Sequence, residues 1–415
     1  MFLLSLAWRS LGNRRLISAL TAASIALSVA LLVGIEHVRM GVRESFAGTI
    51  RGTDLIVGAR GGTTQVLLST VFGMSVPNGS VSWATYERWA AHPAVKWTIP
   101  YALGDAHRGH RVIGTTAAFF EHYRFRDQSV TFASGRAPAN DREIAIGSEV
   151  AERLNYTVGS DVTLAHGLGA VSFAEHEAHP FTVSGVIART FTPIDRALYS
   201  TLEGLTAMHD DEATSGGLMM GPPPVARVPG QQPPITAFML GTKNRFETLQ
   251  LQREMNEDQR EPLTAIIPGV ALQQLWQTIA SAEVGLRVVA LFTVLVGLMG
   301  MVVALYASLE SRRREMAILR AVGAGPRLIV SLLVLESGLL ALAGATAGVA
   351  LVYAGIAVSR AAVEARFGLA LTLHALGGAE WAYLALVVGA GTLVGVLPAW
   401  RAYRSSLADG LSPKL

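Results

Sequence analysis

Two long apolar runs separated by a short basic segment constrain this chain more than any other feature. The first run, residues 287–309, has no charged residue between Arg287 and Glu310, and the second, residues 328–358, has Glu336 as its only charge. A bilayer core about 30 Å thick needs roughly 20 apolar helical residues to cross it. Both runs meet this requirement, so we predict two membrane helices joined by the basic residues 310–327.

Residues 16–38 and 381–400 form two further apolar runs of membrane length. The first is interrupted only near its end, by Glu36 and His37. A cleaved signal peptide is an alternative for this run, but the run is long for such a peptide and no clear small-residue cleavage site follows it, which favours a signal anchor. The basic, amphipathic residues 1–15 are typical of a helix that lies on a membrane surface.

Residues 39–286 contain no run of membrane length, and strand-like and helix-like stretches alternate irregularly, which predicts an α+β domain. Residues 270–283 have helical spacing and no breaker before Arg287, so we expect a helical stalk that continues into the next apolar run. The predicted strands are 54–58, 95–103, 111–115, 143–147, 161–164, 181–188 and 235–241; the predicted helices are 82–91, 116–122, 148–154, 198–209 and 245–256, with Ser82 and Asn244 as N-caps.

The distribution of Arg and Lys predicts the orientation in the membrane. Residues 1–15 carry three arginines, residues 310–327 carry five, and the tail 401–415 carries two arginines and one lysine, whereas the longer loop 359–380 has only two arginines. Basic loops stay in the cytoplasm, so both termini and the basic segment are expected there, and residues 39–286 on the opposite side. The expected fold is therefore a four-helix membrane protein with a large α+β extracytoplasmic domain inserted between the first and second membrane helices.

Several classes of function are excluded by composition and motif. The chain has no cysteine, so it forms no disulfide and no Cys-ligated metal site. Its three lysines (Lys96, Lys243 and Lys414) do not follow a GxxxxG sequence, so there is no Walker A loop. A net charge of +3 gives no argument for nucleic acid. GxSxG is absent and no nucleophile–base arrangement stands out, so we predict no catalytic residue.

The basic segment 310–327 has apolar positions at helical spacing, and Gly323, Gly325 and Pro326 end that pattern. Such a short amphipathic helix can insert into a groove of a partner protein. The alternative is a basic loop that only determines topology.

Polar and small residues within the third apolar run give two further candidates for intramembrane packing. A carboxylate such as Glu336 costs about 2.5–3.5 kcal/mol near the middle of a membrane. It is expected to contact a partner helix, and packing is favoured over a proton or substrate relay. Gly344 and Gly348 permit close helix approach, either at a packing face such as a dimer seam or simply as lipid-facing small residues.

Two histidine pairs raise the question of a metal site. His107 and His110, and His176 and His179, have i, i+3 spacing. Zinc could use such pairs if they were helical, but the first borders a predicted strand and the second lies in a polar stretch. The second pair also does not fit HExxH, so we predict solvated histidines and no bound metal.

Four motifs resemble the FtsX-like permeases of MacB-type ABC transporters. ESRRREMAILRAVGAGPRLI (310–329) resembles the family's segment after the second membrane helix, and PAWRAYRSSLADGL (398–411) resembles its closing segment. LAWRSLGNRR (6–15) is similar to the family's opening, and TDLIVGARGG (53–62) to the start of its outer domain. The order of one membrane helix, a large outer domain and three more helices also resembles the family's layout.

The resemblance implies a permease subunit that is not itself an enzyme and that sits on a separate ABC ATPase. Two ATPase copies would bind ATP and Mg and drive this chain and a second permease, identical or paralogous. Motion would pass from the membrane helices to the outer domain, a mechanism called mechanotransmission. The implied contacts with the ATPase are Glu310, Arg313, Arg314, Glu315, Met316, Leu319, Arg320, Gly323 and Ala324.

The resemblance also implies a bacterial inner membrane, a periplasmic outer domain, contact with lipids, and a possible periplasmic adaptor or substrate-carrier protein. We expect no cofactor on this chain itself. An alternative function is that of an FtsX-like signalling subunit, which senses a ligand or activates an extracytoplasmic hydrolase. An outer domain as large as residues 39–286 favours the transporter.

Overall fold

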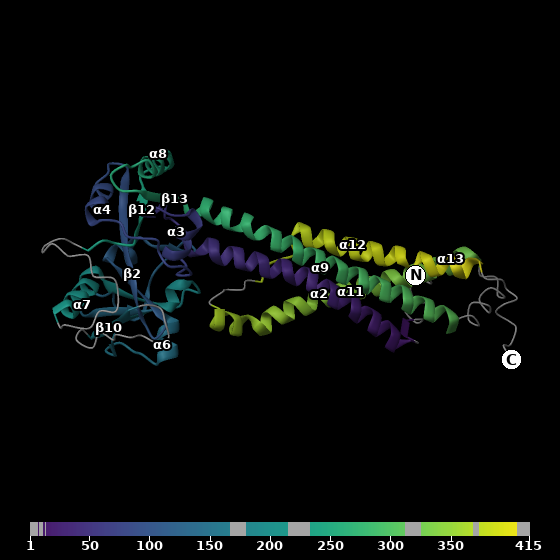
Figure 1. Ribbon diagram of the computed structural model, residues 1–415. Coiled ribbons are helices and arrows are strands. Elements are labelled where there is room, and N and C mark those ends of the chain that lie inside the picture. The colour runs from purple at the N-terminus through teal and green to yellow at the C-terminus, as the bar shows by residue number, and fades with distance from the viewer. Residues whose placement is uncertain are drawn as a thin grey trace. The chain divides into compact units, whose positions relative to one another are not determined.

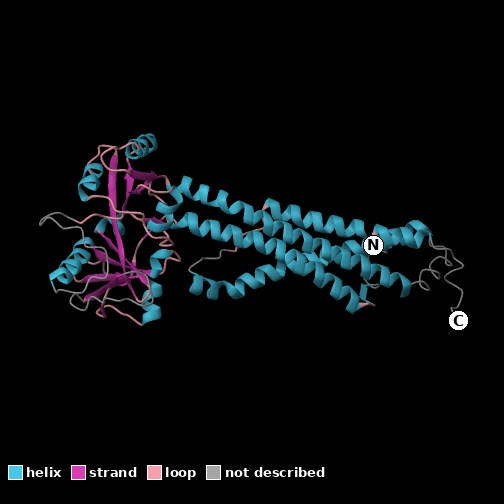
Figure 2. Ribbon diagram, in the orientation of Figure 1, coloured by secondary structure: helices cyan, strands magenta, loops and turns pink. Residues whose placement is uncertain are grey.

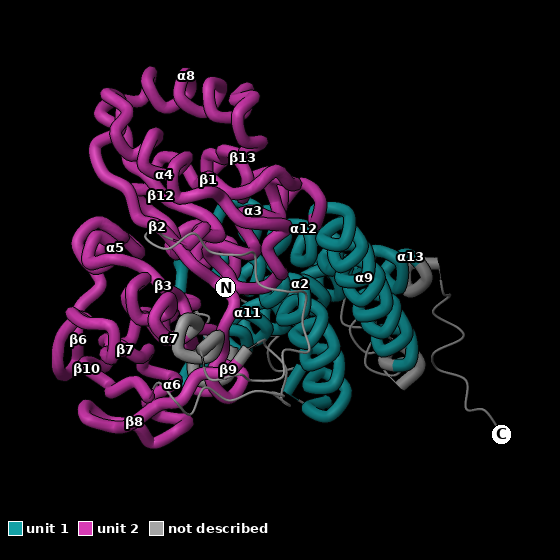
Figure 3. Tube along the Cα trace, turned by 60° about the vertical axis from the view of Figure 1, so that its left-hand side comes forward, with its two compact units in different colours: residues 1–41, 280–361, 371–415 teal, residues 42–279, 362–370 magenta. Residues whose placement is uncertain are grey.

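The computed structural model describes residues 7, 11–12, 14–166, 180–214, 233–311, 325–367 and 373–404. The chain divides into two compact units, which Figure 3 shows in different colours. The helical unit comprises residues 1–41, 280–361 and 371–415, and the sheet unit comprises residues 42–279 and 362–370. Figure 2 shows that the helical unit is built of long helices and that the strands belong to the sheet unit.

Four helices of the described chain are long and apolar enough to cross a membrane. In hydrocarbon no water can satisfy a backbone polar group, so an apolar run of this length forms a helix. The stalk predicted for residues 270–283 is confirmed as the first part of one long helix. The helices, labelled in Figure 1, are α2 (Arg15–Thr49), α9 (Pro268–Ser311), α11 (Pro326–Phe367) and α12 (Gly378–Val394), followed by the short α13 (Val396–Arg404).

Some ends of these helices differ from prediction. The loop predicted over residues 359–380 is shorter, because α11 continues to Phe367 and α12 begins at Gly378. Charged residues such as Arg360 ended the apolar run in the sequence, but they do not end a helix, since arginine has a high helix propensity. Similarly, α2 continues past the predicted end of its apolar run, to Thr49.

The last apolar run, predicted as one span over residues 381–400, is broken at Gly395. Pro398 has no N–H to donate to the carbonyl of Val394, so the α-helical ladder is interrupted there. The break also brings two helices close together, because a Cβ added at Gly395 would lie 2.0 Å from Ser337 Oγ of α11.

The sheet unit contains an eleven-stranded mixed sheet within the described residues, with the order β13-β1-β12-β2-β3-β11-β7-β10-β6. In addition, β8 pairs with β10 and β9 with β2, and β4 and β5 form a separate pair. Parallel pairing joins β3 to β11 and β7 to β10, and the other pairs are antiparallel. The strands are β1 (Leu55–Ala59), β2 (Val95–His107), β3 (His110–Thr115), β4 (Arg124–Phe125), β5 (Gln128–Ser129), β6 (Phe132–Gly135), β7 (Glu143–Ile146), β8 (Asp161–Val162), β9 (Ala165–His166), β10 (Phe181–Ile187), β11 (Ala197–Thr201), β12 (Ala237–Thr242) and β13 (Leu263–Ile266).

Two short helices of the sheet unit begin at the side-chain caps that the sequence predicts. The Ser82 and Asn244 side chains accept hydrogen bonds from Thr85 N and Glu247 N, so both predicted N-caps are confirmed. The helices are α3 (Thr63–Thr70), α4 (Trp83–Ala90), α5 (Ala117–His122), α6 (Ser148–Leu154), the 3-10 helix η1 (Pro193–Arg196), α7 (Leu202–Thr214) and α8 (Arg245–Asn256).

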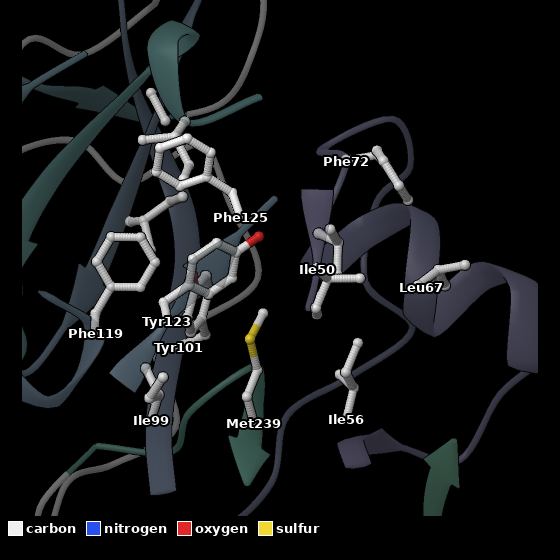
Figure 4. Packing of buried hydrophobic residues seen from close by; sticks show 14 of the residues in the cluster. Ile50, Ile56, Leu67, Phe72, Ile99, Tyr101, Phe119, Tyr123, Phe125 and Met239 are labelled. Atoms are coloured by element: carbon white, nitrogen blue, oxygen red, sulfur yellow. The ribbon is translucent and has the colours of Figure 1, made fainter. Parts of the chain in front are cut away.

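The sheet is buried on both faces, and neighbouring residues of a strand point to different cores. Ile56 of β1 and Met239 of β12 pack into one hydrophobic cluster, while Leu55 and Phe238 pack into another. Figure 4 shows the first cluster, in which Tyr101, Tyr123 and Met239 lie together. Strands covered on both faces read as continuous apolar runs, and β12 is buried at every position.

One predicted helix is wrong at its start. Residues 198–209 were expected to be helical, but residues 197–201 form β11 and α7 begins only at Leu202. Strand β11 pairs in parallel with β3 and antiparallel with β7, so its first four residues are buried. The helix-like spacing of the sequence was outweighed by burial in the middle of the sheet.

A buried carboxylate organises the turn that precedes β11. The Asp195 carboxylate accepts hydrogen bonds from Thr190 N at 2.8 Å, Thr190 Oγ1 at 2.8 Å and Phe191 N at 2.7 Å. Burial raises the pKa of Asp195 above its ordinary value, and these hydrogen bonds act in the opposite direction. The turn depends on this side chain, because the described residues offer no other acceptor to these two backbone N–H groups.

We predict that Asp195→Ala destabilises the sheet unit by about 2 kcal/mol, because two backbone N–H groups lose their acceptor. For a unit of this size, the loss corresponds to about 4–8 °C in melting temperature. Asp161→Ala is the matched control, since Asp161 is exposed and its hydrogen bond from Thr182 Oγ1 is long, at 3.4 Å. Thermal unfolding of the full chain followed by tryptophan fluorescence measures both variants. Equal melting temperatures for the two would contradict the role of Asp195.

We also predict that cysteines at Ser28 and Gly297 form a disulfide between α2 and α9. Ser28 Oγ lies 3.0 Å from Thr293 O, and a Cβ added at Gly297 would lie 2.8 Å from Ser28 Oγ. This spacing allows a disulfide without backbone movement. The chain has no native cysteine, so no other thiol can react. The control pairs Ser28→Cys with Gly300→Cys, where an added Cβ meets nothing within 4 Å. Mild oxidation, then thiol alkylation and mass measurement, should show the bond only in the first pair.

Candidate functional site

The segment expected to contact an ATPase lies almost entirely outside the described residues. Glu310 falls in the last turn of α9. Outside the described residues are Arg313, Arg314, Glu315, Met316, Leu319, Arg320, Gly323 and Ala324. Their assignment to a coupling helix stays a prediction. The described residues that frame the segment are the ends of α9 and α11, at Ser311 and Pro326.

Glu336 lies inside the helical unit. It is 2% exposed, and its neighbour Ser337 is fully buried. Ser337 Oγ donates to Thr392 O at 3.3 Å, so this turn of α11 packs against the end of α12. A carboxylate at this depth among apolar helices is expensive, and its burial removes it from lipid. The position suits helix packing.

Gly344 and Gly348 lie where α11 crosses α2. A Cβ added at Gly344 would lie 2.7 Å from the Ile25 Cβ, and one added at Gly348 would lie 2.6 Å from the Ala26 carbonyl oxygen. The two backbones approach closely only because these positions lack side chains. The contact occurs within one chain, and it uses the small-residue face of α11.

A buried polar cluster joins three parts of the helical unit. His37 Nδ1 of α2 lies 2.6 Å from Glu380 Oε1 of α12, and both side chains are 2% exposed. His37 Nε2 lies 3.2 Å from the His374 carbonyl oxygen, which also accepts a hydrogen bond from Tyr353 Oη of α11 at 2.6 Å. The other Glu380 oxygen accepts from Gly377 N at 2.6 Å and caps α12. Every polar atom named here has a partner, so the cluster holds α2, α11 and α12 together.

A second polar group, which we call the stalk clamp, joins α2 to α9 and consists of Glu36, Arg39, Glu283 and Arg287. The Arg39 guanidinium is hydrogen-bonded to Glu36, and its Nη1 lies 3.3 Å from Glu283 Oε2. Arg287 Nη2 lies 3.7 Å from Glu36 Oε2. The side chains of Glu36 and Glu283 are 7% and 14% exposed, so these are shielded ion pairs.

The same two helices also contact each other within the sheet unit. The Arg43 guanidinium lies 5.4 Å from the ring centre of Trp276, a cation–π arrangement. Phe46 packs edge-on against Trp276 at 5.6 Å and against Phe72 at 4.6 Å. Residues 43–46 of α2 and residue 276 of α9 therefore pair in the sheet unit, as residues 36–39 and 283–287 do in the helical unit.

The sequence contained only part of the signal for the stalk clamp. Glu36 and Arg39 have the i, i+3 spacing of a helical ion pair, and Glu283 and Arg287 have i, i+4 spacing. That the two pairs face each other depends on how α2 and α9 pack. The partners His37 and Glu380 are 343 residues apart, and no local pattern relates them.

The first histidine pair is placed by a tight hairpin. His107 and His110 are paired at the end of β2 and β3. His107 Nδ1 lies 2.6 Å from Thr163 O, and its Nε2 lies 3.1 Å from Tyr156 Oη, so both ring nitrogens are engaged. His110 Nδ1 lies 3.1 Å from Arg196 O. Among the described residues no group of three or more potential ligands could hold a metal ion. The second pair, His176 and His179, lies outside the described residues.

We predict that Arg39→Met destabilises the chain by about 3 kcal/mol, because it leaves two shielded carboxylates beside each other without their shared cation. The triple variant Glu36→Gln, Arg39→Met and Glu283→Gln should recover most of this loss, since it removes both shielded carboxylates and leaves only Arg287, whose side chain is 42% exposed, without its partner. Thermal unfolding of the purified full chain in detergent compares the two. A triple variant less stable than the single one would contradict this account of the clamp.

Comparison with known families identifies both parts of the chain. The family model of the MacB-like periplasmic core domain matches residues 18–228, about half of the chain. The model of the FtsX-like permease C-terminal region matches residues 287–407. No curated protein matches this chain. The four apolar helices and the large mixed sheet match a membrane protein with an extracellular domain.

Two solved structures are similar to part of the chain. One is the periplasmic region of MacB from Actinobacillus actinomycetemcomitans, at 10% identity and a TM-score of 0.34, with 55% of this chain and 94% of that chain covered. The other is the extracellular domain of the noncanonic ABC-type transporter YknZ from Gram-positive bacteria, at 11% identity and a TM-score of 0.30, with 52% and 99% covered. On the two family matches, this chain belongs to the FtsX-like, MacB-type ABC transporter permeases.

Proposed function

We propose that this permease couples ATP hydrolysis by a separate ATPase subunit to motion of its sheet unit, and that this motion drives export or extraction of a substrate. The permease families to which it belongs are typically not catalytic and work with an ABC ATPase. In this proposal the chain itself binds no cofactor, and ATP and Mg bind to two copies of the ATPase. A second permease, identical or paralogous, completes the assembly.

The observation that carries the proposal is the continuity of α2 and α9. The division between the units falls within α2, after Gly41, and within α9, after Ile279. At 1.5 Å per residue the 44 residues of α9 measure about 66 Å. A helix without a break transmits displacement along its axis, whereas a loop of the same length would absorb it. The stalk clamp and the Arg43–Trp276 contact keep the two helices together on both sides of the division.

The proposed placement in the cell follows from charge. The family and the four apolar helices support a bacterial inner-membrane protein with a periplasmic domain. The arginines of residues 1–15, 310–327 and 401–415 favour both termini and the coupling segment in the cytoplasm. The sheet unit then lies in the periplasm, where an adaptor or substrate-carrier protein could dock. Apart from lipid, no other class of partner is proposed, and the chain carries no signal for nucleic acid.

The proposal is tested by the variant Arg313→Ala, Glu315→Ala and Leu319→Ala. It removes one cation, one anion and one apolar side chain from the proposed coupling helix. We expect it to lose the ATPase during purification, and ATP turnover in nanodiscs to fall to the level of the free ATPase. The measurements are the amount of ATPase bound to the tagged permease and the rate of phosphate release.

A matched control removes the same three residue types from an exposed helix of the sheet unit. Leu249→Ala, Arg253→Ala and Glu257→Ala act on α8 and its C-cap, where Leu249 is 61% exposed and the Arg253–Glu257 pair faces solvent. The control should keep the ATPase. Equal retention by both variants would overturn the assignment of the coupling residues. Absence of any ATPase from the unaltered chain would instead favour an FtsX-like signalling subunit.

A further inference from the structure

The sheet unit contains a cavity of about 300 Å³. Its walls come from strands β2, β3, β11 and β12, from η1, and from the end of α3 and the loop after it. Every residue that lines it belongs to the sheet unit. A volume of this size is at the lower end of the range for ligand pockets and has room for about ten water-sized groups.

The charged side chains that line the cavity are all cationic. Arg111 and Arg196 line it, and among the described residues no carboxylate does. The Arg196 Nε is hydrogen-bonded to Glu149 Oε2 at 2.7 Å. Arg111 contacts only neutral acceptors: its Nη1 and Nη2 donate to the carbonyl oxygens of Ser69 and Ser75 at 3.2 and 3.3 Å. A guanidinium has five N–H donors, so Arg111 retains donors for an anion.

Arg111 is also partly withdrawn from water. Burial lowers its pKa from the ordinary value, and no carboxylate in the described part of the chain offsets this effect. The group still carries its charge, since arginine does not lose its proton in proteins. A desolvated cation without a counterion raises the energy of the free sheet unit. An anion bound beside Arg111 would remove that cost.

Two buried phenols in the cavity wall have unused hydroxyl groups. Tyr101 and Tyr199 are 3% and 2% exposed, and neither hydroxyl has a hydrogen-bond partner among the described residues. The third tyrosine, Tyr123, differs, because its hydroxyl donates to Thr49 O at 2.7 Å. Figure 4 labels Tyr101, Tyr123 and Met239, which belong to one hydrophobic cluster. Buried tyrosine hydroxyls are normally paired, so a ligand with acceptor oxygens suits Tyr101 and Tyr199.

The remainder of the wall is apolar. Phe72, Met74, Ile113 and Met239 supply aromatic, thioether and aliphatic surface. Such a wall stabilises the apolar part of a ligand, but it offers no polar group to replace the water around a strongly hydrated ion. The ligand class is therefore limited from two directions: it needs an anionic group for Arg111 and an apolar part for the wall.

We propose that this cavity binds a small organic carboxylate with an apolar body of about eight carbon atoms. The carboxylate accepts hydrogen bonds from Arg111 and from the hydroxyl groups of Tyr101 and Tyr199, and the apolar body packs against Phe72 and Met239. This binding site is independent of the coupling to an ATPase.

The first test compares two ligands on the unaltered full chain in nanodiscs. 4-Methylbenzoate and 4-methylbenzamide have the same shape and ten non-hydrogen atoms each, and they differ in the anionic charge. Isothermal titration calorimetry, with protein-free nanodiscs as the blank, should give an affinity for the carboxylate at least tenfold higher than for the amide. Equal affinities, or binding of neither compound at millimolar concentration, would overturn the proposal and leave a cavity that holds only water.

The second test removes the proposed contacts. Arg111→Gln should lower the affinity for 4-methylbenzoate to that for 4-methylbenzamide. The affinity for 4-methylbenzamide itself should not change. Tyr101→Phe with Tyr199→Phe should weaken carboxylate binding at least fivefold, because two hydrogen bonds to the carboxylate are lost. Arg253→Gln and Tyr86→Phe are the matched controls outside the cavity and should bind as the unaltered chain does. Full affinity in Arg111→Gln would contradict the proposal.

The two ligands keep the test decisive even if a variant fails to fold, because their comparison needs no substitution. No ATPase is present in these titrations. Failure of the proposed coupling and failure of ligand binding are therefore distinguishable.

Discussion

The structure depends on the unbroken backbone hydrogen bonding of its long helices α2 and α9. Inside hydrocarbon every backbone N–H and C=O must be paired within its own segment, so an apolar run of membrane length becomes helical, without interruption in α2, α9 and α11. In α2 and α9 the same helix continues beyond the apolar run, to Thr49 at one end and from Pro268 at the other. Because the helical ladder is continuous, both units share two stiff elements. This continuity allows the proposed transmission of motion in a permease whose sequence has no Walker A loop.

Two kinds of contact hold α2 against the other helices of the helical unit. Where α11 crosses α2, Gly344 and Gly348 allow the backbones to approach, and the contact gains dispersion energy from many close atoms. Where charges occur, at His37–Glu380 and in the stalk clamp, each group has a partner, because an isolated charge there would cost several kcal/mol. The first kind of contact requires glycine at particular positions of α11, and the second adds directional contacts between specific charged or polar groups. Both therefore favour the same arrangement of the helices.

The sheet unit is stabilised mainly by apolar packing on both faces of its sheet. Its central strands are buried on both faces, so alternate residues of one strand belong to different hydrophobic clusters. Within this dense packing, a cavity bordered by Arg111 and by two unpaired phenols is an exception. Cores usually avoid such groups, because a buried donor without an acceptor costs about 1–3 kcal/mol. The proposed carboxylate would accept hydrogen bonds from these groups.

The sequence by itself determined the parts of this protein: four apolar helices, an α+β region between the first two in the chain, the N-caps at Ser82 and Asn244, and the family. These features are local, since hydrophobic run length, capping residues and short motifs are legible within a few residues. The tertiary structure decided the rest. Strand β11 formed where a helix was expected because neighbouring strands bury it. His37 and Glu380, like Arg111 and the two phenols, come from distant parts of the chain, and only packing of whole elements brings such groups together.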